Sequence, residues 1–213
     1  MTKKRLKKIL SQVPPNYYEK GVRTNFLQKY WHKKKWHHLE EFLNGIECSA
    51  LLDIGCADGT TTRQLQKIIP GARIVGVDYY KNAIDYAKRK KSKIKFVHAD
   101  VHNLPFANNS FDTVTAIETL EHLTFPERVL DEIRRVLKPG GYLIIGQDTD
   151  SILFRTIWFA WTKWKGSVWE NSHINCMKPQ DLINTLKKHG FKIEKSKIVN
   201  LGMETFIKAR KKR

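Results

Sequence analysis

The sequence has few cysteines and no long apolar run, and each scarcity excludes a class of protein. Three cysteines (Cys48, Cys56 and Cys176) are an odd number without paired spacing, which argues against a disulfide framework or a four-cysteine zinc site. We therefore expect a reducing, cytoplasmic location. The longest apolar-aromatic run, residues 152–161, has ten positions, whereas a bilayer-spanning helix needs about 20 apolar residues. The basic first residues lack a following apolar segment, so we expect neither a signal peptide nor a transmembrane segment.

Acidic residues are scarce at the two ends of the chain. The 213 residues include 39 Lys+Arg and 21 Asp+Glu, which gives a formal net charge of +18. The net charge is +9 over residues 1–40, +1 over residues 41–186 and +8 over residues 187–213. Such ends either attract the phosphates of RNA or of an anionic membrane, or act as solvated tails. The 41% of hydrophobic residues is enough for the core of one globular domain.

The glycines of a dinucleotide-binding fingerprint are also missing. The pattern G-x-G-x-x-G would need glycine at positions 55, 57 and 60, but the chain has Gly55, Ala57 and Thr60. Without the second and third glycines a pyrophosphate cannot approach the turn closely. The sequence therefore does not predict a site for NAD or FAD.

Short apolar runs alternate with amphipathic segments from residue 50 onward, a pattern typical of βαβ units. We predict that residues 1–45 form a basic, helical N-terminal extension and that residues 46–213 form one domain. The pattern predicts an α/β fold with an open, doubly wound sheet that ends in a hairpin. The predicted strands are 50–54, 73–77, 94–98, 111–117, 142–146, 191–199 and 201–209, and the predicted helices are 60–69, 81–91, 127–137 and 179–189.

Acidic residues fall at the ends of three predicted strands. Asp53 belongs to the first strand, Asp78 follows the second, and Asp100 follows the third. Because the carboxyl ends of parallel strands meet at one edge of an open sheet, we expect these three side chains to face one site. A carboxylate after the second strand can accept hydrogen bonds from ribose hydroxyls, and one after the third can accept from the amine of adenine.

The motifs resemble those of class I S-adenosylmethionine-dependent methyltransferases. The matching segments are Leu51-Leu-Asp-Ile-Gly-Cys-Ala-Asp-Gly59, Val75-Gly-Val-Asp78, Ala99-Asp-Val101, Phe111-Asp112 and Arg135-Val-Leu-Lys-Pro-Gly-Gly-Tyr142. The resemblance implies a Rossmann-like, seven-stranded sheet with an antiparallel last strand, and S-adenosylmethionine (SAM) as cofactor. The sequence departs from the family pattern at Ala57, where many relatives carry glycine.

The resemblance also assigns residues to the cofactor. It places Asp53, Gly55 and Gly59 at the methionine end of SAM, Asp78 at the ribose, and Asp100 with Val101 at the adenine. The full set of predicted cofactor-binding residues is Asp53, Gly55, Cys56, Gly59, Asp78, Tyr79, Asp100, Val101 and Glu118.

The segment after the fourth predicted strand offers groups for catalysis. His122 has a reference pKa near 6.5, which suits a general base at neutral pH. Glu118, Glu121 and His122 are spaced so that one helical turn would bring them together. We predict Glu121, His122 and His173 as catalytic residues and expect no metal. The alternative is a divalent metal held by Glu118, Glu121, His122 and His173, similar to metal-assisted O-methyltransferases of ubiquinone synthesis and of small-RNA 3′ ends.

Residues 151–175 are rich in aromatic and basic side chains, and we predict that they form a lid on the acceptor side. This segment either lines a pocket for an apolar or planar acceptor, rests on a membrane interface, stacks on unpaired bases, or simply packs on the sheet. In this family the corresponding segment often builds the acceptor pocket.

Three functions remain open from the sequence. The first is methyl transfer from SAM to a small or lipid-like acceptor, at an oxygen atom. The second is ribose methylation of RNA, with the basic ends gripping phosphates. Residues 117–120 lack the Asn/Asp-Pro-Pro-Tyr/Phe motif of base-amine methylases, and the chain has no Pro-Cys nucleophile for pyrimidine carbon-5 chemistry. The third is a SAM-binding interaction module without turnover.

Overall fold

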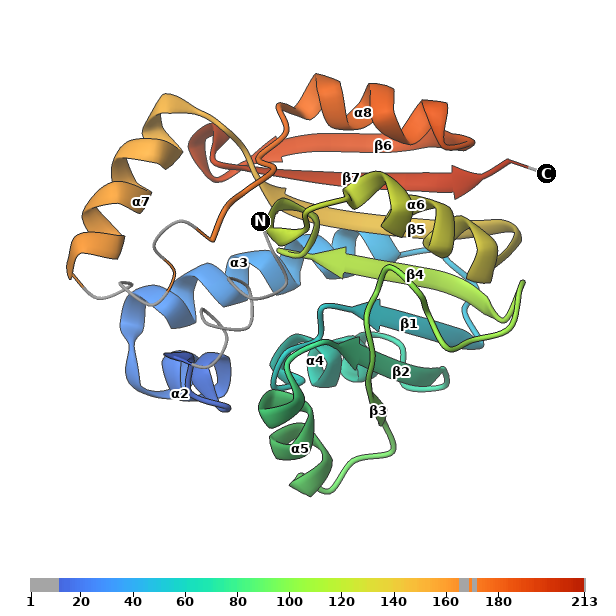
Figure 1. Cartoon of the computed structure of the whole chain (residues 1–213), viewed down its shortest axis with the longest axis horizontal. Helices are drawn as coiled ribbons and strands as arrows, with labels where there is room; N and C mark the ends of the chain where they lie inside the picture. The colour runs from blue at the N-terminus through green and yellow to red at the C-terminus, as the bar shows by residue number, and fades with distance from the viewer. Residues whose placement is uncertain (1–11, 165–168, 170–171, 213) are drawn as a thin grey trace.

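Short apolar runs form a seven-stranded sheet at the centre of the molecule (Figure 1). The computed structural model describes residues 12–164, 169 and 172–212. The strands lie in the order β3-β2-β1-β4-β5-β7-β6, and β7 runs antiparallel to both of its neighbours. The strands are β1 (Ala50–Ile54), β2 (Arg73–Asp78), β3 (Lys95–His98), β4 (Phe111–Ile117), β5 (Leu137–Asp148), β6 (Phe191–Val199) and β7 (Glu204–Lys211). This arrangement confirms the predicted Rossmann-like sheet with an antiparallel last strand.

Helices cover both faces of the sheet. They are α2 (Tyr17–Thr24), α3 (Phe26–Leu43), α4 (Thr60–Ile68), α5 (Lys81–Arg89), α6 (Pro126–Val136), α7 (Ile152–Trp164) and α8 (Pro179–Lys188). Helices α6 and α8 pack in one core and α3, α4 and α5 in another. Leu51 and Leu52, neighbours in β1, belong to opposite cores because successive side chains of a strand point to opposite faces. A bilayer crossing would need a longer apolar helix than any in the described part of the chain.

Three segments differ from the expectation. Strand β7 begins at Glu204 instead of residue 201 because residues 200–202 form a 3₁₀ turn, in which Asn200 and Leu201 adopt φ values of +51° and +57°. Strand β5 begins at Leu137, because Leu137 already pairs with Phe111 of β4; the register shifts before Tyr142, and Gly140 in between has a φ of +74°. Residues 152–164, for which the sequence predicted no regular structure, form helix α7.

Helix α3 shares the core of the sheet. Leu39 and Phe42 have no exposed surface, and the ring centroid of Phe42 lies 5.8 Å from that of Phe206 on β7. The predicted helical character of the first 45 residues is confirmed for α2 and α3, whereas residues 1–11 lie outside the described residues. The domain boundary at residues 45 and 46 stays a prediction.

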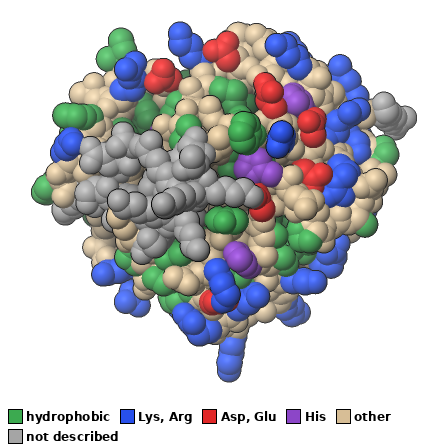
Figure 2. Space-filling model, viewed as in Figure 1, with side chains coloured by type: hydrophobic (Ala, Val, Ile, Leu, Met, Phe, Trp, Pro, Cys, Tyr) green, Lys and Arg blue, Asp and Glu red, His purple; other side chains and the backbone are tan. Residues whose placement is uncertain are grey.

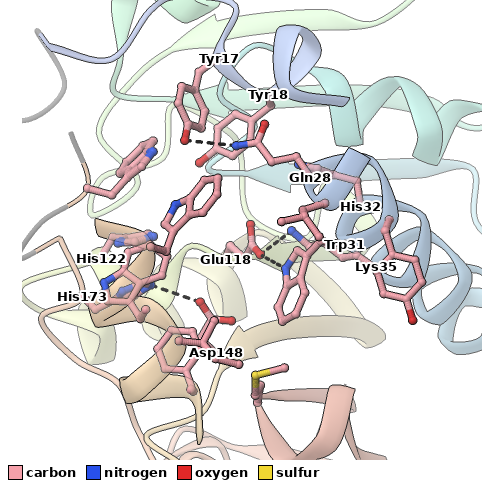
Figure 3. A pocket seen from close by; sticks show the side chains of 18 residues that line it. Tyr17, Tyr18, Gln28, Trp31, His32, Lys35, Glu118, His122, Asp148 and His173 are labelled. Carbon is pink, nitrogen blue, oxygen red and sulfur yellow. Dashed lines mark hydrogen bonds and ion pairs between the residues drawn. The ribbon is translucent and has the colours of Figure 1, made fainter. Parts of the chain in front are cut away.

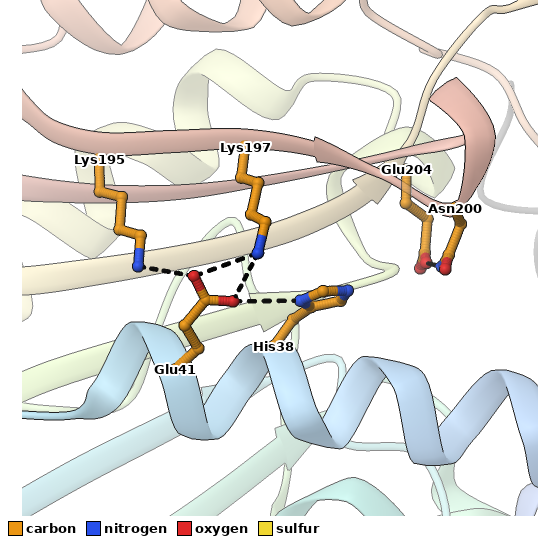
Figure 4. Close-up of polar contacts among 6 residues, drawn as sticks. All are labelled: His38, Glu41, Lys195, Lys197, Asn200 and Glu204. Atoms are coloured by element: carbon orange, nitrogen blue, oxygen red, sulfur yellow. Dashed lines mark hydrogen bonds and ion pairs between the residues drawn. The ribbon is translucent and has the colours of Figure 1, made fainter.

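Ionic contacts also join α3 to the terminal hairpin (Figure 4). The carboxylate of Glu41 accepts hydrogen bonds from Lys195 Nζ at 2.8 Å and from Lys197 Nζ at 2.9 Å. These two lysines lower the pKa of Glu41 to about 2. Part of the positive charge of the C-terminal segment is therefore neutralised within the fold.

We expect Phe42→Ala to lower the free energy of unfolding by about 3–5 kcal/mol, because it removes a fully buried ring and leaves a cavity. Phe26→Ala is the matched control, since Phe26 lies on the same helix with 79% of its surface exposed. Urea denaturation of the two variants measures the difference. Equal stabilities would contradict the packing of α3 on the sheet.

Candidate active site: two cavities that share a wall

The carboxyl ends of β1, β2 and β4 border the smaller of two adjoining cavities. Its volume is about 120 Å³. The turn after β1 contributes Gly55, Ala57 and Asp58, the end of β2 contributes Asp78, Tyr79 and Tyr80, and Val101 closes one side. The segment before α2 covers it with Val13, Pro14 and Pro15. Such an edge of an open sheet is where ligands bind in doubly wound folds.

Asp78 is one of three acidic residues that line this cavity, with Asp58 and Glu118. Its two carboxylate oxygens accept hydrogen bonds from the backbone N–H of Ala57 at 2.8 Å and of Tyr80 at 2.7 Å. Burial raises the pKa of Asp78, while these backbone donors oppose the shift. Each carboxylate oxygen has a second lone pair, so Asp78 can still accept hydrogen bonds from two vicinal hydroxyls. This geometry fits the predicted ribose contact.

The turn after β1 depends on left-handed backbone. Gly55 and Gly59 have φ values of +71° and +76°, and a Cβ on Gly55 would collide with the side chain of Thr119. Ala57 adopts φ +45° in the same turn, a conformation that costs an L-residue about 1–2 kcal/mol. Its N–H nevertheless reaches Asp78, so the departure from the family at this position leaves the turn intact.

Asp53 and Asp100 lie differently from Asp78. The Asp53 carboxylate accepts hydrogen bonds from the hydroxyls of Thr62 and Thr115, both at 2.7 Å, and burial raises its pKa to about 6. It thereby ties β1 to α4 and β4. It borders a third cavity of about 30 Å³, together with Cys56. Asp100 Oδ1 lies 2.7 Å from Nδ1 of His102. Of these three acids, only Asp78 is among the residues that line the smaller cavity. The expectation that all three face one site is therefore not met.

The larger cavity has a volume of about 320 Å³ and mostly aromatic walls (Figure 3). Helices α2 and α3 form one side and α7 the other. Its lining includes Tyr17, Tyr18, Tyr30, Trp31, Phe154, Trp158, Trp161, Trp169, His122 and His173. Five residues line both cavities: Tyr17, Tyr18, Glu118, His122 and Trp169. The two cavities therefore meet at a shared wall.

A buried ion pair lies in this wall. Lys35 on α3, with 1% of its side chain exposed, places Nζ 2.5 Å from Oε1 of Glu118, which follows β4. Trp31 Nε1 donates to the same oxygen at 3.3 Å. Burial opposes the charge of Glu118, but Lys35 outweighs it and lowers the pKa of the carboxyl to about 2. Glu118 is thus ionised and faces both cavities.

The pKa values of the neighbouring carboxyl groups are raised. Burial and the charge of Glu118 raise the pKa of Asp148, and burial raises that of Glu204 to about 8. Burial and Asp148 raise the pKa of Glu121. A carboxyl group without its own cation is more stable in the neutral form when it is removed from water.

His122 and His173 stack beside these carboxyls. Their ring centroids are 4.8 Å apart, and His173 Nε2 lies 3.3 Å from Asp148 Oδ2. His122 Nδ1 lies 3.0 Å from the carbonyl oxygen of Ser172, which can only accept, so Nδ1 carries the proton and Nε2 has a free lone pair. Burial lowers the pKa of both imidazoles to about 4, and both are neutral at pH 7. The pKa of His122 is therefore lower than the 6.5 expected from the sequence, which makes it a weaker base, although its free form predominates at pH 7.

The structure does not gather Glu118, Glu121 and His122 as the spacing predicted. Glu118 has φ +49° and precedes the 3₁₀ turn Leu120–His122, so its side chain extends to Lys35 instead. Ligand atoms of Glu121, His122 and His173 lie within 4.8 Å of one another. Glu121 is fully buried and outside the lining of either cavity, and its catalytic role stays a prediction.

The sequence analysis missed the contribution of the N-terminal helices. Tyr18, Trp31, His32 and Lys35 line the larger cavity, whereas the sequence predicted this segment only as a basic, helical extension. The four-residue spacing of Trp31 and Lys35, which places both on one helical face, was the available signal. This spacing is a weak signal, because four lysines occur within residues 29–35 and the sequence does not distinguish Lys35 from the others.

The fold places the smaller cavity at the edge of the sheet where ligands bind in doubly wound folds, beside a larger cavity with aromatic walls. Residues 52–145 match the methyltransferase domain family. This part of the chain, residues 52–145, is therefore a domain of the class I SAM-dependent methyltransferase type. The predictions of family and of SAM as cofactor are confirmed at the level of the family.

Individual relatives are similar over different lengths. Demethylmenaquinone methyltransferase of Clavibacter sepedonicus is 37% identical over 98 residues, 45% of this chain and 39% of that protein. The protein of the same name from Thermotoga maritima is 26% identical over 177 residues, 75% and 77% of the two chains. A SAM-dependent methyltransferase structure from Mesorhizobium loti has a TM-score of 0.66 at 19% identity and covers 83% of this chain and 97% of that chain. The matched regions span 25% to 39% of the first four curated relatives.

We expect Asp78→Ala to weaken SAM binding by about 1.5–3 kcal/mol, because hydrogen bonds to a charged acceptor are lost. Asp85→Ala is the control, since Asp85 is an acid on α5 that pairs with Lys81 outside the cavities. Calorimetric titration with SAM measures both affinities. An unchanged affinity in the Asp78 variant would remove Asp78 from the site.

We expect Lys35→Met to lower the free energy of unfolding by about 1–3 kcal/mol, because it leaves Glu118, whose side chain is only 21% exposed, without its cation. The double variant Lys35→Met with Glu118→Gln removes both charges and should recover most of the loss. Denaturant unfolding of the two single variants and the double variant gives the coupling energy. Additive losses would show that the pair is not an energetic unit.

Proposed function

We propose that this protein transfers a methyl group from SAM to an oxygen atom of a small or lipid-like acceptor in the larger cavity. The observation that carries the proposal is the wall shared by the two cavities. A methyl donor in the smaller cavity and an acceptor in the larger one would meet at Glu118 and His122, which line both. Bound SAM supplies an activated methyl group there.

The walls of the larger cavity support an apolar or planar acceptor. Phe154 and Trp158 stack with ring centroids 5.7 Å apart, and Trp158 lies 4.2 Å from His173. Aromatic walls with a few polar groups are typical of pockets that orient a small molecule. We propose that residues 151–175 act as the acceptor-side lid, since α7 and His173 contribute to this wall.

The chain positions the acceptor and receives its proton. Much of the rate enhancement of a displacement reaction comes from orientation, and the aromatic walls hold the acceptor toward the shared wall. The Nε2 atom of His122 has a free lone pair at the shared wall, so it accepts the proton that an acceptor hydroxyl loses. Glu118 presents a fixed negative charge to the side of the smaller cavity. Lys35 keeps that carboxylate ionised in a site with little water.

RNA ribose methylation is the second candidate. The observation in its favour is the basic charge of the chain ends. Against it, Lys195 and Lys197 are paired with Glu41, and the one lysine among the described residues that lines the larger cavity, Lys35, is paired with Glu118. A binding module without turnover would use the smaller cavity alone and leaves the larger one without a role. The free state of Cys48, Cys56 and Cys176 supports our proposal of a cytoplasmic location.

Transfer of label from methyl-labelled SAM into whole-cell extract tests the proposal. The extract is separated into organic-soluble, nuclease-sensitive and protein fractions after incubation with the purified protein. We expect label in the organic-soluble or small-molecule fraction, and at least tenfold less of it with the Asp78→Ala variant at a SAM concentration below the Kd. Label in the nuclease-sensitive fraction would replace the proposal with RNA methylation, and no label in any fraction would favour a binding module.

We expect His122→Ala to lower turnover by about 10²–10⁴-fold, the usual contribution of a general base, without a change in SAM affinity. His37→Ala is the control, because His37 is an exposed imidazole on α3 outside the cavities. Steady-state rates and SAM titrations of both variants measure the effect. Normal turnover in the His122 variant would exclude this imidazole as the base.

A further inference from the structure

Helix α7 is apolar on two opposite sides. Phe154 and Thr162 are buried, and Trp158 and Trp161 line the larger cavity, so these residues form the inner side. Ile152, Leu153, Phe159 and Trp164 form an outer side, where Ile152 is 84% exposed and Trp164 is 73% exposed. A helix that is apolar all round is normally buried in protein or in a membrane. In the described part of the chain nothing covers this outer side.

The first turns of α3 continue the exposed apolar surface. Phe26, Leu27 and Tyr30 are 79%, 61% and 53% exposed. Leu27 and Tyr30 line the larger cavity from α3, as Ile157 does from α7, and all three are also exposed. The exposed residues of α3 and α7 therefore flank the mouth of the larger cavity. We call the set Phe26, Leu27, Tyr30, Ile152, Leu153, Ile157, Phe159 and Trp164 the mouth face.

The charge around the mouth face has one predominant sign. Helix α7 contains Arg155 and Lys163 and no acidic residue. Residues 17–35 contain six basic residues and one acidic residue, and the acid, Glu19, pairs with Arg63 and Lys90. In Figure 2, Lys and Arg side chains lie among the hydrophobic ones along the left edge, where α7 lies in Figure 1.

We infer that the mouth face docks on the surface of a membrane that contains anionic lipids, and that the acceptor enters the larger cavity from that membrane. Helices that lie in a bilayer interface combine exposed aromatic and aliphatic side chains with Lys and Arg, as α3 and α7 do here. Tyr and Trp side chains favour the level of the lipid headgroups. The exposed lysines of α3, Lys29, Lys33 and Lys34, supply the attraction to anionic headgroups, whereas Lys35 is buried against Glu118. The route of the acceptor rests on the proposed function, whereas the docking does not.

Sedimentation with lipid vesicles tests the docking without SAM or acceptor. The probes are vesicles of phosphatidylcholine alone and of phosphatidylcholine with phosphatidylglycerol at about a three-to-one ratio. We expect the full-length protein to bind the mixed vesicles, to bind the neutral ones at least tenfold more weakly, and to dissociate at high salt. Absence of binding to the mixed vesicles would overturn the inference and leave the proposed methyl transfer unaffected.

Variants of the mouth face separate it from the basic chain ends. Phe26→Ser with Phe159→Ser should weaken vesicle binding by tenfold or more, because two exposed rings no longer enter the interface. Lys29→Glu with Lys33→Glu should weaken it by at least fivefold for each lysine. The controls are Phe125→Ser, an exposed ring outside both cavities, and Lys187→Glu with Lys188→Glu at the far end of α8.

Two outcomes would contradict the inference. If the mouth-face variants and the control variants bind vesicles equally, the basic ends and not this face carry the attraction. If sedimentation velocity shows a dimer that Phe26→Ser with Phe159→Ser dissociates, the face is an interface between two copies. Circular dichroism and SAM titration of each variant, both expected to be unchanged, confirm that it is folded.

Discussion

The ion pair between Lys35 and Glu118 is the interaction on which the site depends. It joins α3, which comes from the N-terminal extension, to the end of β4, where the Rossmann-like sheet opens. Charges are costly to bury unless they are paired, so this contact fixes the position of α3 relative to the sheet. That position in turn sets the wall between the two cavities. The extension is therefore as much a part of the site as the motifs of the family are.

The charges of Lys35 and Glu118 also affect the pKa values of the neighbouring groups. Because Lys35 is engaged by Glu118, the carboxyls of Asp148 and Glu204 have no buried cation of their own among the described residues, and burial raises the pKa of both, that of Glu204 to about 8. The buried imidazoles of His122 and His173 remain neutral for the same reason, which is the cost of removing a charge from water. The larger cavity thus carries little net charge despite its many titratable groups, and this suits an apolar acceptor.

The sequence predicted the sheet well and the acceptor side only in part. Alternating apolar runs and the turn at Gly55 are local signals, so strands β1 to β4 and the place of Asp78 could be predicted from them. The direction of Glu118 could not, because it depends on one left-handed residue and on a lysine 83 positions earlier in the chain. Helix α7 was missed because a helix with apolar residues on two sides has no clear period. Contacts between distant segments leave no periodic trace in a single sequence.

The most direct test of the account is an experimental structure with S-adenosylhomocysteine and, where it can be identified, the acceptor. The account predicts the ribose at Asp78 and the sulfur atom at the shared wall, facing the larger cavity between Glu118 and His122. A sulfur atom that points away from the larger cavity, or a ribose bound elsewhere, would contradict the claim that the two cavities meet at the reacting atoms.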